Sequence, residues 1–112
     1  MTEQKICSLT AENFEAALQD NELVLIEFWA HWCTPCEHME GIFSELQQTM
    51  GDRVRFYRVD ADTEVDVSEC FNILTLPTIL LFHNKKLVER TVGPKSKRVL
   101  TDLIEKHCGL DS

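Results

Sequence analysis

The sequence lacks an excess of basic residues, long hydrophobic runs, internal repeats and low-complexity segments. Its 11 Lys and Arg residues are outnumbered by 19 Asp and Glu residues, and the formal net charge is −8. Contact with nucleic acid phosphates needs a basic surface, so this charge argues against a nucleic-acid-binding protein. No stretch approaches the roughly 18 consecutive apolar residues of a membrane span, so we expect no membrane insertion.

Two marks of a secreted protein are also missing. Residues 1–5 do not show the charged-then-apolar pattern of a secretory signal. The five cysteines, at positions 7, 33, 36, 70 and 108, are an odd number and a poor match to a secreted disulfide framework. We therefore expect a cytoplasmic protein, in which Cys7, Cys70 and Cys108 are inert thiols.

The length and the apolar content suit one domain over residues 1–112, because 44% of the residues are hydrophobic. Apolar spacing predicts strands over 5–9, 23–30, 54–59, 78–82 and 87–92. Helices are predicted from Thr10 to a break at Asn21-Glu22, over 33–50, over 63–71, and from a cap at Ser96 to a stop at Gly109. The order βαβαβαββα implies an α/β fold with a central mixed sheet and helices on both faces.

Local signals refine these elements. Thr63 and Asp66 have the spacing of a capping box at the start of the third helix. Asn84-Lys85 predicts the turn of a hairpin between the last two strands. In the last helix, the apolar residues expected to face inward are Val99, Leu100, Leu103 and Ile104.

The most informative segment is Trp32-Cys33-Thr34-Pro35-Cys36. It lies where a buried strand passes into a helix, so the first sulfur is expected at the helix N-terminus and at the protein surface. Unpaired N–H groups and the helix dipole favour the thiolate there, and the thiolate is the species that attacks disulfides. A structural disulfide or half of a zinc site are the alternatives. Zinc would need two further ligands, and only His31 and His38 lie nearby.

Together with Phe28-Trp29-Ala30, Thr75-Leu76-Pro77-Thr78 and Val92-Gly93, this segment makes the chain resemble the thioredoxin family over nearly its whole length. The resemblance implies the thioredoxin fold and thiol–disulfide oxidoreductase activity toward protein disulfides. It implies no bound cofactor and no metal, because the two sulfurs carry the electrons. The implied partners are disulfide-containing proteins and a thioredoxin-reductase-type electron donor, and the family default is a monomer.

The resemblance also assigns roles by position. Cys33 matches the attacking cysteine and Cys36 the resolving one, while Pro77 matches a cis-proline beside the dithiol. Trp29 and Arg58 match structural positions near the site. The residues that match the substrate-binding surface are Trp32, Thr34, Pro35, Thr75, Leu76, Val92 and Gly93.

Glu27 interrupts the apolar strand and matches a buried acid beneath the dithiol. Burial would raise the pKa of its carboxyl group, which suits a base that takes the proton from Cys36. Arg58 stands where the family carries a lysine, and its charge would oppose that shift. A glutamate that reaches water at the strand end is the alternative.

Two other functions remain open from the sequence. Glu27, and Glu37 where many relatives carry lysine, lend slight support to a disulfide oxidase or isomerase. A non-enzymatic binding adaptor would use the same substrate-binding surface without turnover, although the retained dithiol argues against this function.

Overall fold

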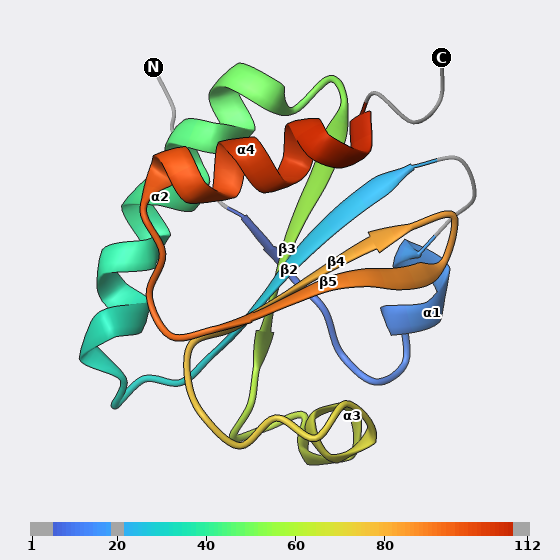
Figure 1. Ribbon diagram of the computed structural model, residues 1–112. Coiled ribbons are helices and arrows are strands. Elements are labelled where there is room, and N and C mark those ends of the chain that lie inside the picture. The colour runs from blue at the N-terminus through green and yellow to red at the C-terminus, as the bar shows by residue number, and fades with distance from the viewer. Residues whose placement is uncertain (1–5, 19–21, 109–112) are drawn as a thin grey trace.

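The computed structural model describes residues 6–18 and 22–108. Their elements follow the expected order of strands and helices (Figure 1). The strands are β1 (Cys7–Ser8), β2 (Leu23–Trp29), β3 (Val54–Asp60), β4 (Thr78–His83) and β5 (Lys86–Val92). The helices are α1 (Phe14–Ala17), α2 (Thr34–Met50), α3 (Val65–Cys70) and α4 (Lys97–Cys108).

The five strands form one mixed sheet in the order β1-β3-β2-β4-β5. β3 runs parallel to both β1 and β2, whereas β4 is antiparallel to β2 and to β5. β2 therefore lies at the centre, as its continuous hydrophobicity predicts for a strand that is covered on both faces. The expected fold class is confirmed.

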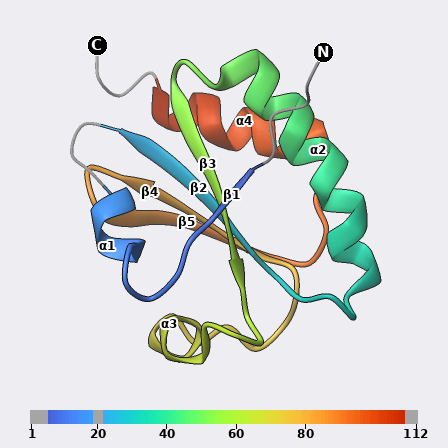
Figure 2. The ribbon, with the colours of Figure 1, turned by 180° about the vertical axis from the view of Figure 1, so that it is seen from behind.

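Alternation along β2 divides the core into two layers. Leu23 and Leu25 pack with α2 and α4, whereas Val24, Ile26 and Phe28 pack with α1 and α3. Figure 2 shows the same arrangement from behind, with α2 and α4 on one face of the sheet and α1 and α3 on the other. β2 is thus held rigidly where it leads into the Cys33 segment.

The hairpin between β4 and β5 is confirmed. Its two-residue turn places Asn84 and Lys85 at φ values of 54° and 71°. Two successive positive φ values are typical of a type I′ turn, whose twist suits a two-residue hairpin. The turn therefore forms although Lys85 occupies a position that favours glycine.

Some predicted boundaries and caps were wrong. β1 and α1 are shorter than expected, and the predicted positions Lys5, Asn21 and Gly109 lie outside the described residues. Thr63 and Asp66 form no capping box. The carbonyl of Asp60 accepts hydrogen bonds from the N–H groups of Thr63 and Glu64, so the chain still turns there and α3 begins only at Val65.

The last helix begins as expected, because the N–H of Val99 donates to Ser96 Oγ at 3.1 Å. Its inward stripe is formed by Leu100, Ile104 and His107, at helical spacing. Val99 lies one residue off this stripe and is 43% exposed, so its predicted inward position was wrong. Among the described residues, none of the helices has both the length and the hydrophobicity to cross a membrane.

Candidate active site

The start of α2 holds Cys33 and Cys36 in a disulfide, with their Cα atoms 5.3 Å apart. Cys33 is the N-cap residue in an extended conformation, and its Sγ accepts the N–H of Cys36 at 3.3 Å. Pro35 lies in the first turn, where its missing N–H leaves no helical bond unmade. The first sulfur therefore lies at the positive end of a 17-residue helix.

Cys33 was expected at the surface, and in this disulfide-bonded state that expectation was wrong. Cys33 is 3% exposed and Cys36 1%. Both pack with Ala30, and Trp29 and Leu76 cover the group. These neighbours shield the sulfur of Cys33 from solvent. The intervening Thr34 and Pro35 are exposed.

The ends of β4 and β5 form a second wall of the site. The Leu76–Pro77 peptide bond is cis, as the sequence resemblance implied. The N–H of Gly93 donates to the carbonyl of Pro77 at 2.8 Å, which ties the end of β5 to the start of β4. Gly93 has a φ of +90°, a value that favours glycine. Val92 is 49% exposed and Thr75 is also exposed, so both offer contact surface.

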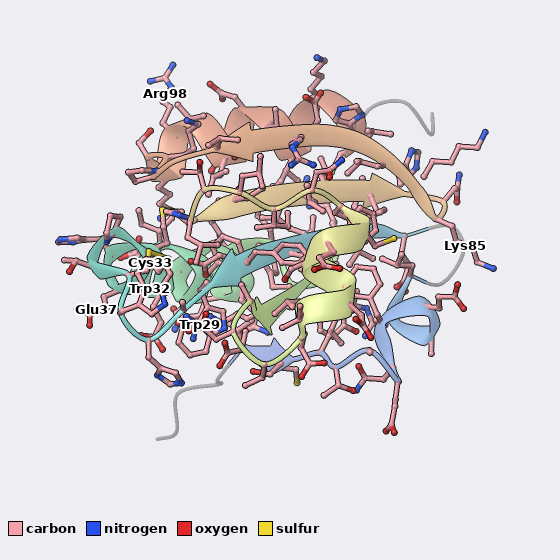
Figure 3. The ribbon with its side chains drawn as sticks, turned by 90° about the horizontal axis from the view of Figure 1, so that it is seen from below. Trp29, Trp32, Cys33, Glu37, Lys85 and Arg98 are labelled. Carbon is pink, nitrogen blue, oxygen red and sulfur yellow. A yellow bond between two sulfur atoms is a disulfide. The ribbon has the colours of Figure 1, made fainter. Side chains whose placement is uncertain are left out.

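Trp32 is the large aromatic surface beside the disulfide. It is 69% exposed, and its indole Nε1 donates to Asp62 Oδ2 at 3.0 Å. Figure 3 shows Trp29, Trp32, Cys33 and Glu37 gathered at one end of the molecule, with Lys85 at the opposite end. Asp62, which follows β3, thereby holds the orientation of this exposed ring.

Glu27 lies at the sheet centre and is fully buried. Arg58 is beside it on β3, with Nε 3.4 Å from Glu27 Oε1, the distance of an ion pair rather than of a short hydrogen bond. Burial raises the pKa of the Glu27 carboxyl from 4.5 to about 7, and the Arg58 charge opposes part of that rise. The expected burial and pKa direction are both confirmed, and the solvent-exposed alternative is wrong.

Arg58 links this acid to the surface. Its guanidinium carbon lies 4.1 Å from the centroid of the Trp29 ring, and its Nη1 is 3.4 Å from Glu40 Oε2. A cavity of about 250 Å³, here called the Arg58 pocket, has both Arg58 and Cys36 in its wall. The pocket gives water a place between the second sulfur and the guanidinium that contacts Glu27. A larger cavity of about 510 Å³ lies near Cys7 and the C-terminal end of α2, away from the dithiol.

Sequence reasoning missed Asp62 and also Arg90. The Arg90 guanidinium donates to the carbonyls of Phe71 and Asn72, both at 2.7 Å, and so holds the segment that leads to Pro77. Neither contact has a local sequence signal, because each joins residues at least 18 positions apart. In the described part of the chain, no group of three or more His, Cys, Asp or Glu residues is arranged to hold a metal ion.

Comparison with known proteins gives a consistent result. The family model described as thioredoxin matches residues 5–106. The thioredoxin of Bacillus subtilis (strain 168) is 33% identical over 102 residues, which cover 91% of this chain and 97% of that protein. A bifunctional thioredoxin reductase/thioredoxin of Mycobacterium leprae is 31% identical over 105 residues, which are 89% of this chain and 23% of that protein.

Solved structures agree with these sequence matches. Malassezia sympodialis thioredoxin (Mala s 13) superposes with a TM-score of 0.85 at 27% identity, covering 96% of both chains. Oxidised mitochondrial thioredoxin 3 of Saccharomyces cerevisiae has a TM-score of 0.82 at 27% identity, covering 90% of this chain and 94% of that chain.

Proposed function

Because this chain belongs to the thioredoxin family and is a thiol–disulfide oxidoreductase, we propose that Cys33 attacks protein disulfides and that Cys36 completes their reduction. The observation that carries this order is the position of Cys33 as N-cap of α2. Its sulfur already accepts an N–H of the first turn, and the same donor and the helix dipole would favour a thiolate there.

The exchange takes two steps. The Cys33 thiolate attacks one substrate sulfur, an S–S bond forms between enzyme and substrate, and the other substrate sulfur leaves with the electron pair of the broken bond. Cys36 then loses its proton and attacks Cys33 Sγ. The substrate sulfur that was bound to Cys33 leaves with the electron pair of that bond, and the enzyme retains the Cys33–Cys36 disulfide. Two electrons pass from the enzyme to the substrate, and the sulfurs need no other cofactor.

We propose that Glu27 accepts the proton that the Cys36 thiol loses. A carboxyl group with a pKa of about 7 exists in both forms near neutral pH, which is what a general base needs. The Arg58 pocket supports a water-mediated path, since Cys36 lines it and Arg58 contacts Glu27. Arg58 and Trp29 then act as positioning residues, because they hold the acid and cover the pocket.

The substrate chain would lie across the exposed rim of the site. In this proposal, the backbone of Thr75 and Leu76 pairs with an extended substrate segment beside Pro77, by strand addition. The side chains that contact the segment are those of Trp32, Thr34, Pro35 and Val92, with Gly93 leaving room for a close approach. Recognition through backbone groups would give broad specificity.

The remaining partners follow from the chemistry. The oxidised pair must be reduced again, and we propose a thioredoxin-reductase-type enzyme as the electron donor. The Mycobacterium leprae relative supports this, because its name combines a thioredoxin reductase with a thioredoxin. We further propose that the protein acts as a monomer in the cytoplasm and transfers electrons in cell redox homeostasis.

The direction of exchange is tested by the equilibrium potential of the Cys33–Cys36 couple, measured against a glutathione buffer by alkylation of the free thiols. We expect a reducing potential of about −270 mV, because a couple more reducing than those of disulfide isomerases and oxidases favours the reduction of substrate disulfides. A potential of about −180 mV or higher would instead assign the protein to disulfide formation or isomerisation.

A further inference from the structure

Another cavity lies on the α3 side of Trp32, the residue that precedes Cys33. This side pocket has a volume of about 270 Å³, and its wall includes Trp32, Asp62, Ser68, Glu69, Leu74 and Leu76. We propose that it binds a lysine or arginine side chain of the substrate, near the substrate's reactive cysteine. The inference rests on the proposed function, and it adds a preference for disulfides flanked by basic residues.

The location of the pocket ties it to the reaction. Trp32 directly precedes Cys33, and Leu76 belongs both to the pocket wall and to the group that covers the disulfide. A substrate segment paired with the Leu76 backbone would point alternate side chains to the same side. One of them, a few residues from the attacked cysteine, would therefore lie over this pocket.

The apolar part of the wall is unusually exposed. Leu74 is 91% exposed and Trp32 is 69% exposed. Clustered exposed apolar side chains mark interaction surfaces. The aliphatic stem of a lysine or arginine can cover such a surface while its charged head stays near water, and a guanidinium can also stack on an indole ring.

The polar part of the wall has one sign of charge. Its two ionisable residues are Asp62 and Glu69, and no Lys, Arg or His lines the pocket. Asp62 binds Trp32 through one carboxylate oxygen, and a carboxylate can accept further donors. Within the described residues, the Glu69 carboxylate has no ion-pair or hydrogen-bond partner. These groups match a cationic side chain and would repel an acidic one.

Ser68 gives an independent indication of a ligand. Its residue is only 7% exposed, and its hydroxyl group lacks a hydrogen-bond partner among the described residues. A buried hydroxyl without a partner costs free energy, unlike an exposed one. Ser68 lines the pocket next to Glu69, so a polar group bound there would lie against the residue that carries this hydroxyl group.

The test uses three disulfide-bonded peptides that differ only at one residue beside the cysteine, which is Lys, Leu or Glu. This residue is moved in turn through the neighbouring positions, and kcat/KM is measured with the reduced protein. At the best position, we expect the Lys peptide to react about 10-fold faster than the Glu peptide. The reason is that Asp62 and Glu69 attract the lysine side chain and repel the glutamate side chain. The Leu peptide should lie between them.

Glu69→Gln should reduce the preference for Lys by about 5-fold and leave the Leu peptide unchanged. Glu105→Gln removes the same charge from an exposed position on α4, and it should leave the preference intact. The proposal is wrong if the Lys and Glu peptides react equally at every position, or if both variants change the preference alike. If none of the three peptides is reduced, the proposed function itself fails.

Discussion

Replacing Cys36 by serine is expected to convert the protein into a trap that holds its substrates in a mixed disulfide with Cys33. The first attack needs only the Cys33 thiolate, which the N-terminus of α2 still favours in this variant. Release needs a second sulfur close to Cys33 Sγ, and the Cys33–Cys36 disulfide shows that Cys36 meets that requirement. An intramolecular thiol has an effective concentration far above that of any dissolved thiol, so turnover should fall by about 1,000-fold or more.

The readout is turnover in a protein-disulfide reduction assay, together with mass spectrometry of the trapped species. Cys7, Cys70 and Cys108 lie outside the disulfide, so a variant with serine at all three positions serves as the reference. Cys33→Ser in that reference should lose turnover without forming the trap. The opposite pattern, with a trap at Cys36 in Cys33→Ser, would reverse the two assignments. A variant that binds substrate equally well without either sulfur would indicate an adaptor.

Replacing Glu27 by alanine is expected to lower kcat by about 100-fold at neutral pH and to change KM far less. General-base catalysis contributes at least that factor, and Glu27 is buried beneath the site, away from the proposed contact surface. In the native protein, the kcat should rise with pH as the carboxyl group ionises near its pKa of about 7. The Glu27→Ala variant should lack this rise of kcat, so the test is to measure kcat and KM below and above pH 7. An unchanged kcat at every pH would remove Glu27 from the mechanism.

The same acid makes a prediction for folding stability, and Glu27→Gln is the matched variant because it keeps the shape without the charge. The pKa of Glu27 is higher in the folded protein, about 7, than its ordinary value of 4.5. The folded state therefore binds more protons than the unfolded state in this range, and stability must fall as pH rises from 4.5 to about 7. The full difference is on the order of 3 kcal/mol. Thermal unfolding of Glu27→Gln should lack this slope, whereas an identical slope would assign it to other groups.

Much of the site could be predicted because its main signals are local in sequence. The strand before Cys33, the helix after it and the proline in its first turn all follow from neighbouring residues. The burial of Glu27 was also predictable, because its apolar neighbours on a central strand left no exposed face.

What could not be predicted depends on contacts between distant segments. The hydrogen bond from Trp32 to Asp62 joins residues 30 positions apart, and the Arg90 guanidinium on β5 reaches the residues that follow α3. Both are set by the order of strands in the sheet rather than by local pattern. The burial of Cys33 was missed because a position at a helix N-terminus predicts stabilisation of the thiolate. It does not predict which neighbouring side chains cover the sulfur.

The most direct test of the central claim is the alkylation rate of each cysteine in the reduced protein, followed across pH by mass spectrometry after brief exposure to iodoacetamide. Cys7 and Cys70 are exposed and provide internal references for ordinary thiols. We predict that Cys33 reacts first, and that its rate rises at a pH below about 8.5, the ordinary pKa of a cysteine thiol. A Cys33 that reacts no faster than Cys7 and Cys70 at any pH would contradict the proposed attack.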